Sequence, residues 1–251
     1  MRLKADLHIH TALSPCAAQD MTPPAIVAAA VQAGLNMIAI CDHSSAGNVR
    51  AVQDAAHHAA HEAAADTLTV IAGMEITTAE EVHVLGLFPD ADRALAAAAV
   101  VQRTLPAARK PARGFGVQSL MDAEGRTVGV DRAMLSAASA LDLAAALALV
   151  REHGGLAIAS HVDRPSFSVL SQLGMIPPDA RFDALELSVA GRRLGRGGEV
   201  ERLSLPVVCS SDGHSPEEVG AGYTVFQAGG ASFEELALAL AGRDGRGIVH
   251  A

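Results

Sequence analysis

Short apolar runs alternate with helical segments along most of this chain, and that alternation limits the folds it can adopt. Residues 36–41, 68–72 and 156–160 are near-continuous apolar runs, which is typical of strands buried on both faces. Helical segments between such strands favour a parallel sheet that is covered on both sides. We therefore predict an α/β fold, and 251 residues are enough for a distorted, TIM-like barrel of βα units.

The regular alternation is interrupted around residues 104–140, where we expect an insertion. Two short apolar runs, at residues 117–120 and 127–130, flank a polar turn that suits a hairpin. Basic side chains precede this hairpin, so the insertion is a candidate lid that helps to recognise a phosphorylated substrate; a solvated loop is the alternative. These basic residues are Arg109, Lys110 and Arg113. No internal repeat is evident, and we expect residues 1–251 to form a single catalytic domain.

Composition and charge argue against several classes of protein. The formal net charge of -9 disfavours stable binding to a nucleic-acid backbone, because phosphate contacts need an excess of Lys and Arg. With no Trp and one Tyr, the chain also offers few platforms for stacked bases. It shows neither the apolar stretch of a signal peptide at its start nor a run that could span a membrane, so we expect a cytoplasmic protein. Its oligomeric state stays open.

Polar residues gather where the predicted strands end, beginning with the segment from Asp6 to Thr11. Side chains alternate between the faces of a strand, so Asp6, His8 and His10 are expected to share one face. Two neighbouring imidazoles favour metal binding, although ordinary polar residues also occur in this spacing. Similar residues follow the other predicted strands, and in a βα barrel these positions meet at the face where active sites form. They are Asp42, His43, Glu75, His161, Asp212 and His214.

The number of candidate ligands predicts more than one metal ion. A mononuclear catalytic zinc site takes three protein ligands and leaves one position open. This chain has many more candidates, so two or three divalent ions fit better, and Glu75 is the natural bridge because a carboxylate has two oxygens. The candidates are His8, His10, Cys16, His43, Glu75, His83, His161, Asp212 and His214.

The mixture of ligand types indicates both the metal and the reaction. Imidazole, carboxylate and thiolate together favour zinc, iron or manganese over magnesium or calcium. Three such ions would outweigh the negative charges of Glu75, Asp212 and an ionised Cys16, so the pocket would attract a phosphate. A metal-bound water has its pKa lowered to about 7, which gives a hydroxide nucleophile at neutral pH. Cys41 and Cys209 lie in apolar runs and are expected to be buried thiols.

Six motifs follow one another along most of the chain: Asp6-Leu7-His8-Ile9-His10-Thr11, Asp42-His43, Gly73-Met74-Glu75, His83, Ser160-His161 and Asp212-Gly213-His214. In this order they resemble the motifs of the PHP family (polymerase and histidinol phosphatase). The resemblance implies a distorted (β/α)7 barrel with a trinuclear metal centre. The loops at residues 13–16 and 161–168 look like those of a stand-alone branch of metal-dependent phosphoesterases, and nothing in the chain resembles an attached polymerase.

The resemblance also implies a grouping of the ligands around the ions. The first ion would be bound by His8, His10, Glu75 and Asp212, the second by Glu75, His83 and His161, and the third by His43, His214 and Cys16. Family members commonly have a histidine where this chain has Cys16, and thiolate can replace imidazole on zinc or iron.

Two residues are expected to be catalytic. Asp212 would hold a metal, and the guanidinium of Arg164 would clamp the substrate phosphate, because its two-point fork matches phosphate oxygens. A solvated surface arginine is the alternative for Arg164. Asp6 is expected either to orient a ligand from behind or to cap its strand.

These features predict a metal-dependent hydrolase of phosphate esters, acting on a small phosphorylated metabolite or nucleotide. Two alternatives stay open. One is a metal-dependent amidohydrolase, whose barrels also begin with His-x-His on the first strand, and the other is a non-catalytic metal-binding accessory module. The sequence does not identify the substrate, the metal, or the choice between monoester and diester.

Overall fold

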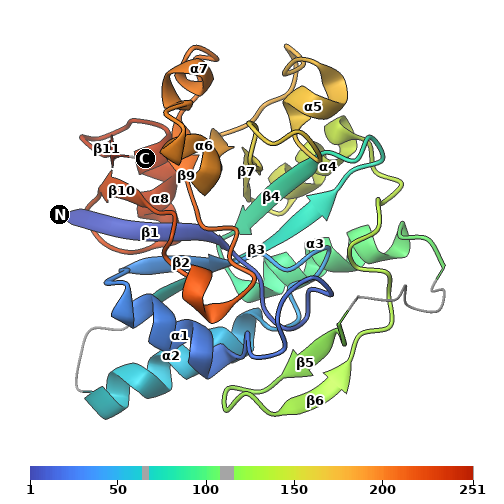
Figure 1. Ribbon diagram of the computed structural model, residues 1–251, viewed down its shortest axis with the longest axis vertical. Helices are drawn as coiled ribbons and strands as arrows, with labels where there is room; N and C mark the ends of the chain where they lie inside the picture. Colours follow the sequence, from blue (N-terminus) through green and yellow to red (C-terminus); the bar gives the residue numbers. More distant parts are fainter. Residues whose placement is uncertain (64–67, 108–115, 251) are drawn as a thin grey trace.

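Nine strands form one strongly curved sheet in the computed structural model, which describes residues 1–63, 68–107 and 116–250 (Figure 1). Across the sheet the order is β11-β10-β1-β2-β3-β4-β7-β8-β9. The strands are β1 (Arg2–Ile9), β2 (Met37–Ile40), β3 (Thr69–Thr77), β4 (His83–Phe88), β7 (Leu156–Ala159), β8 (Ala184–Leu187), β9 (Val207–Cys209), β10 (Thr224–Gln227) and β11 (Gly247–His250).

The sheet is nearly closed, because the segment after β9 returns to β1. Gly213 forms a parallel bridge with Ile9. The His10 N–H donates to the Gly213 carbonyl at 3.0 Å, and the Gly213 N–H donates to the His8 carbonyl at 3.2 Å. The seven strands from β1 to β9 therefore make the wall of a distorted, TIM-like barrel, as predicted, while β10 pairs with the first half of β1 and extends the sheet.

The prediction of a parallel sheet is wrong at β4, which runs antiparallel to both β3 and β7. Only residues 78–82 separate β3 from β4, whereas a parallel connection needs a crossover of a dozen or more residues. β10 and β11 are also antiparallel to their neighbours. Between named strands of the described residues, parallel pairing joins β1, β2 and β3 in one group and β7, β8 and β9 in another.

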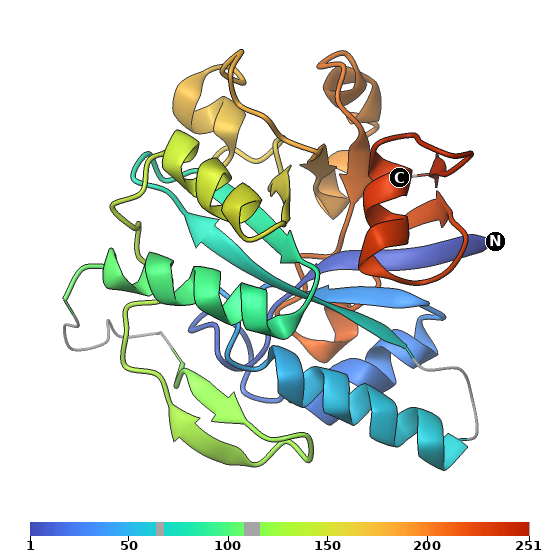
Figure 2. The same ribbon diagram turned by 180° about the vertical axis from the view of Figure 1, so that it is seen from behind.

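Helices cover the outer face of the wall, which Figure 2 shows from behind. The predicted start of α1 is confirmed, since the Thr22 side chain accepts from the Ala25 N–H and two prolines follow it. Among the described residues, no helix has both the length and the apolar character needed to cross a membrane. The helices are α1 (Pro23–Gln32), α2 (Val49–Ala63), α3 (Ala91–Arg103), α4 (Leu143–Glu152), α5 (Val169–Leu173), α6 (Val189–Arg193), α7 (Gly197–Glu201), the 3-10 turn η1 (Pro216–Glu218) and α8 (Phe233–Leu240).

The expected insertion contains the predicted hairpin, formed by β5 (Ser119–Met121) and β6 (Thr127–Val130) as a separate two-stranded sheet. Buried Asn48 fixes it to the barrel: its amide donates to the Ser119 carbonyl and its oxygen accepts from the Met121 N–H, each at 2.9 Å. The basic residues of the candidate lid, Arg109, Lys110 and Arg113, lie outside the described residues.

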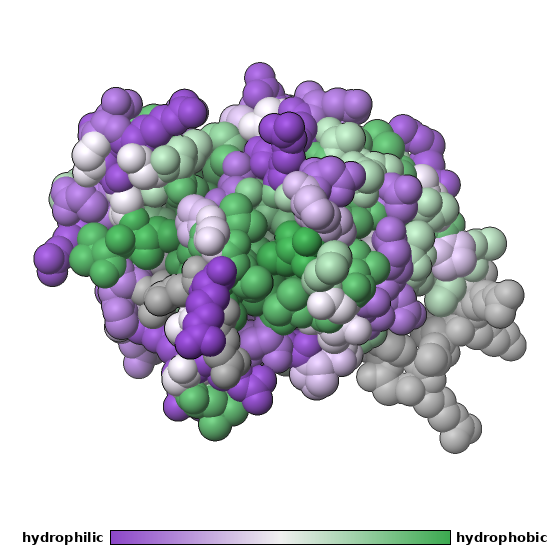
Figure 3. Space-filling model, turned by 90° about the horizontal axis from the view of Figure 1, so that it is seen from above, coloured by the Kyte–Doolittle hydropathy of each residue, from purple (hydrophilic) through white to green (hydrophobic). Residues whose placement is uncertain are grey.

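Apolar side chains fill both faces of the wall. One cluster lies inside the barrel and includes Leu7, Leu85 and Ile158 together with residues of α8, which covers that end. The other joins the outer face to the surrounding helices. Seen from above, apolar side chains also gather in the middle of the surface, with hydrophilic side chains around them (Figure 3). The inner apolar layer matters for the site because polar side chains at the ends of the strands lie directly on it.

Truncating the inner layer tests its contribution to stability. Leu7 is fully buried, so Leu7→Ala is expected to lower the free energy of unfolding by about 2–5 kcal/mol, the usual cost of such a cavity. Leu95 on α3 is 36% exposed, and Leu95→Ala is the matched control with little change. Urea unfolding followed by circular dichroism measures both, and equal midpoints for the two variants would contradict this packing.

Candidate metal centre

A bulge in β1 changes which of its side chains face the site. Between Asp6 and Ile9, β1 has one residue more than the paired part of β2. Such a bulge shifts the alternation of side chains along a strand. Leu7 lies in the apolar interior, and His8 turns inward as well to meet the site. The prediction that Asp6, His8 and His10 share one face is therefore wrong for Asp6.

Four side chains from three strand ends come together at the first position. His8 Nε2 and His10 Nε2 are 3.1 Å apart, and Asp212 Oδ1 is 3.3 Å and 3.2 Å from them. Glu75 adds Oε1 at 3.5 Å from His8 Nε2 and Oε2 at 3.7 Å from His10 Nε2. Ligands held about 2.1 Å from a tetrahedral zinc are about 3.4 Å from one another. These residues therefore fit one divalent ion.

The Glu75 carboxylate faces further imidazoles on its other side. Glu75 Oε1 is 2.9 Å from His83 Nδ1 and 3.4 Å from His161 Nε2, and Oε2 is 3.1 Å from His43 Nδ1. Several of these buried atoms nevertheless have no well-oriented hydrogen bond, namely Glu75 Oε1, His43 Nδ1 and His83 Nδ1. Buried polar atoms left in this way need another partner. A second ion beside Glu75 fits that need.

The protonation states of the two carboxylates and of His10 suit cation binding. Burial alone would raise the pKa of Glu75, but His83 and His8 hold it well below its usual range. Burial opposes ionisation of Asp212 too, yet His8 and His10 hold the pKa of its carboxyl well below normal. Burial, followed by the nearby His214, lowers the pKa of His10 well below its ordinary value. Ionised carboxylates and a neutral imidazole are the forms that ligate metals.

Cys16, His43 and His214 meet at the edge of the cluster. Burial of the sulfur would raise the pKa of the Cys16 thiol, but the nearby imidazoles of His214 and His43 lower it to about 7. The residue itself is exposed. Nitrogen atoms of His10, His43 and His214 lie within 4.8 Å of one another. All nine expected ligands thus converge on one site, with His10 close to the third position as well as the first. The other two thiols, Cys41 and Cys209, are buried as expected.

Glu186 on β8 orients the site and was missed from the sequence. Its Oε2 accepts from His8 Nδ1 and from the His161 N–H, each at 3.0 Å. A carboxylate accepts hydrogen bonds, so Glu186 holds a proton on His8 Nδ1 and points Nε2 at the cluster. Burial would lower the pKa of His8, but Glu186, Asp212 and Glu75 raise it well above its ordinary value, so a metal ion would displace a proton from Nε2. The available signal was a single acid inside the apolar run of residues 184–187.

A chain of polar groups orients His10 in the same way. The Ser14 hydroxyl donates to Asp42 Oδ1 at 2.7 Å, and its oxygen accepts from His10 Nδ1 at 2.9 Å. Asp42 is held in turn by the Thr11 N–H at 2.8 Å. Asp42 was expected among the polar residues of the site, but its partner Ser14 was not.

Asp6 acts from outside the cluster. Its carboxylate accepts from the N–H groups of Ser211 and Gly220, each at 2.9 Å, and so fixes the segment that carries Asp212. Burial raises the pKa of Asp6 to about 6, against the lowering effect of these hydrogen bonds. Asp6 was expected either to orient a ligand from behind or to cap its strand. The structure shows that it positions the backbone next to Asp212 and does not contact a ligand side chain.

Arg164 reaches the cluster. Its Nη1 is 2.5 Å from Asp212 Oδ2, and the side chain is 41% exposed. Asp212 and His161 both have left-handed backbone conformations, with φ of 51° and 29°. Non-glycine residues adopt these only where the surroundings impose them, often at functional sites. Arg164 is thus a partly exposed arginine that pairs with Asp212, and its catalytic role stays a prediction.

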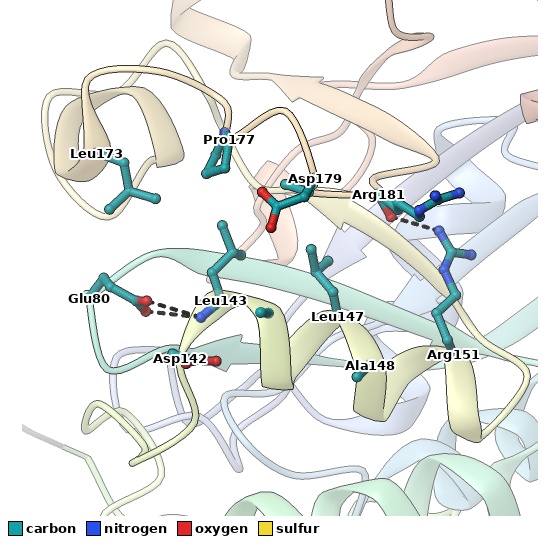
Figure 4. A pocket seen from close by; sticks show the side chains of 12 residues that line it. Glu80, Asp142, Leu143, Leu147, Ala148, Arg151, Leu173, Pro177, Asp179 and Arg181 are labelled. Atoms are coloured by element: carbon teal, nitrogen blue, oxygen red, sulfur yellow. Dashed lines mark hydrogen bonds between the residues drawn. The ribbon is translucent and has the colours of Figure 1, made fainter.

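Two cavities of the described residues lie away from this cluster. One of about 370 Å³ lies beside α4, where Leu143, Leu147, Leu173 and Pro177 line it and Glu80 accepts from the Leu143 N–H (Figure 4). Another, of about 680 Å³, lies between α1 and α2. Neither contains an expected ligand, so the chemistry of the side chains, and not cavity size, identifies the site.

Comparisons with known proteins agree with this geometry. A model of the PHP domain matches residues 6–168, and a PHP-associated model matches residues 199–243. No curated protein matches the chain.

Several solved structures share the fold. Endonuclease Q of Pyrococcus furiosus is 21% identical with a TM-score of 0.67, over 99% of this chain and 58% of that one, so this chain spans little more than half its length. A protein of Bifidobacterium adolescentis described as a metal-dependent phosphoesterase is 20% identical, with a TM-score of 0.54, over 85% and 88% of the two chains. An amidohydrolase of Chromobacterium violaceum with bound sulfate and no metal is 19% identical, with a TM-score of 0.56, over 86% and 89%.

The contact of Glu186 with His8 predicts an effect on metal affinity. Glu186→Gln weakens the acceptor that holds His8 and is expected to lower metal affinity by about 10- to 100-fold, as is usual for groups that orient a ligand. Competition with a chromogenic chelator measures the affinity. Glu234→Gln, on the exposed side of α8, is the matched control and should leave the affinity unchanged. Equal affinities for both variants would contradict the role of Glu186.

Alkylation kinetics test the state of Cys16. Because the thiolate is the reactive form, iodoacetamide should modify Cys16 in metal-free protein with half-maximal rate near pH 7, well below the ordinary value of 9.0. Buried Cys41 and Cys209 should stay unmodified. Zinc should slow modification of Cys16 if the thiolate is a ligand. Peptide mass spectrometry gives the rates, and a profile centred near pH 9 or an absence of zinc protection would count against this assignment.

Proposed function

The chain belongs to the PHP family, and from that premise we propose that it is a metal-dependent phosphoesterase that hydrolyses a small phosphorylated metabolite or nucleotide. The matched model covers well over half of the chain. A metal-dependent hydrolase is thus established at the level of the family. One observation supports phosphate esters in particular: a cluster of metal-ligating side chains has the guanidinium of Arg164 at its edge.

In this proposal the expected ligands hold two to three ions of zinc, iron or manganese. His8, His10, Glu75 and Asp212 would hold the first, Glu75, His83 and His161 the second, and His43, His214 and Cys16 the third. Mixed nitrogen, oxygen and sulfur donors support these metals. Bound ions of this kind supply Lewis acidity and bring the pKa of a water to about 7.

The side chains of the protein supply orientation and charge. Glu186 and Ser14 fix the imidazoles of His8 and His10, so that these ligands do not have to reorganise during the reaction. Arg164 pairs with Asp212 Oδ2 and is half exposed, so its remaining N–H groups can hold phosphate oxygens in a two-point fork. Arg164 would thus add one positive charge at the edge of the site, on a chain whose net charge is -9.

Two proteins with this fold suggest alternative activities for the chain, cleavage of a nucleic acid and hydrolysis of an amide. Endonuclease Q has been solved with a 27-mer duplex that contains an abasic lesion, and the fold covers 99% of this chain. The net charge of -9 supports a small ester over a nucleic acid, because contacts to many phosphates need basic residues in excess. An amidohydrolase is the other alternative, and it would need no phosphate clamp at Arg164.

Hydrolysis by metal-reconstituted protein tests the proposal. Zinc-, iron- and manganese-loaded samples are offered a panel of small phosphate esters, an abasic duplex, and amides and lactones. Release of inorganic phosphate or alcohol from small esters, abolished by a chelator, is the expected result. Cleavage of the duplex alone would favour a nuclease, cleavage of amides or lactones alone an amidohydrolase, and inert metal-loaded protein an accessory module.

Substitution of Arg164 tests phosphate recognition independently of metal binding. Arg164→Ala should lower kcat/KM by about 10- to 100-fold with unchanged metal content, because charge-assisted hydrogen bonds to phosphate are lost. Arg164→Lys should restore part of the loss. Arg193→Ala, at an exposed arginine of α6, is the control and should behave as wild type. Steady-state kinetics that show no difference between Arg164→Ala and Arg193→Ala would remove Arg164 from the mechanism.

A further inference from the structure

Phe167 lies against the cluster, on the loop that joins β7 to α5. Its ring stacks on the imidazole of His83, with centroids 4.7 Å apart and 24° between the planes. Its carbonyl accepts from the His83 N–H at 2.8 Å. Both the ring and the backbone of Phe167 are therefore held beside a side chain that is itself 2.9 Å from Glu75.

The backbone of the loop between β7 and α5 holds the Phe167 ring against His83. Phe167 has a left-handed backbone, with φ of 57°, which costs energy for a residue with a bulky side chain. The Ser168 hydroxyl donates to the Arg164 carbonyl at 2.8 Å and closes the loop beneath it. Arg164 and Phe167 therefore sit on one short, fixed turn.

The exposed members of the cluster show which side is open. His8, His10 and Glu75 are buried, whereas Arg164 and Phe167 are 41% and 39% exposed. Arg164 and Phe167 therefore offer exposed surface on one side of the buried carboxylate and imidazoles, while Cys16 is exposed at the edge formed with His43 and His214. Phe167 is unusual in this respect, because three other phenylalanines, Phe88, Phe182 and Phe226, are buried.

We propose that Phe167 determines specificity by stacking its exposed face against a planar ring in the leaving group of the phosphate ester. The inference rests on the proposed function, since the ester must lie at the metal cluster. One face of the Phe167 ring meets His83, and because the residue is 39% exposed, the ring can also meet a second flat group at the usual stacking distance. Arg164, on the same turn, takes the phosphate. The pair therefore selects phosphate esters whose alcohol carries an aromatic or heteroaromatic ring.

Two phosphonates that differ only in planarity test this inference without any turnover. Benzylphosphonate and cyclohexylmethylphosphonate carry the same anion on rings of similar size. Calorimetry with zinc-loaded protein should show benzylphosphonate bound about fivefold to tenfold more tightly, because stacking of aromatic rings adds to the burial of their surface. Phe167→Leu should remove the preference, and Phe167→Tyr should keep it. Phe233→Leu, the same change on α8, is the control and should keep it too.

Three results would overturn the inference. They are equal binding of the two phosphonates by wild type, failure of both to bind, and a preference that persists in Phe167→Leu. Metal content is measured on every variant, because loss of metal from Phe167→Leu would mean that the ring merely supports His83, which also overturns it. If esters are not hydrolysed but the benzyl preference follows Phe167, then the proposed function fails while the stacking role stands.

Discussion

The burial of Glu75 among imidazole rings is the interaction on which the rest of the structure depends. A charged carboxylate inside a protein is costly unless it is paired. Glu75 is 1% exposed and lies within 3.7 Å of nitrogen atoms on five histidines, which come from β1, β4 and the loops after β1, β2 and β7. The barrel brings these elements together at one of its ends. The apolar layer inside the barrel, below the histidines, excludes water from the opposite end. Cations shared between these groups would satisfy atoms that the protein leaves without hydrogen-bond partners.

Buried polar groups around the cluster hold its side chains in place. Glu186 fixes His8 and the backbone of His161, and Asp42 fixes Ser14, which in turn fixes His10. Asp6 holds the segment of Asp212 by its backbone. Glu186 and Ser14 accept from Nδ1 of His8 and His10, so Nε2 of each imidazole faces the cluster before a ligand arrives.

Much of this site could be predicted because strand ends of a βα barrel meet at one face. The convergence of His43, Glu75 and His161 needed only the positions of the strands, and the hairpin at residues 119–130 needed only a turn signal. The bulge in β1 could not be foreseen, because it depends on how β1 pairs with β2 and not on its own alternation. The antiparallel course of β4 was readable from its short connection but was missed. Short elements such as α6 and β11 carry too little periodicity to be recognised, and the single-domain expectation stays a prediction.

Metal stoichiometry tests the central claim most directly, namely that Glu75 is the shared ligand of a multinuclear centre. Wild-type protein reconstituted with zinc, iron or manganese is freed of excess metal and measured by mass spectrometry beside Glu75→Gln. The account predicts at least two ions per chain in the wild type and one or none in Glu75→Gln, because removing a bridging carboxylate disrupts two positions at once. A single ion in the wild type, or the same number of ions in both proteins, would contradict it.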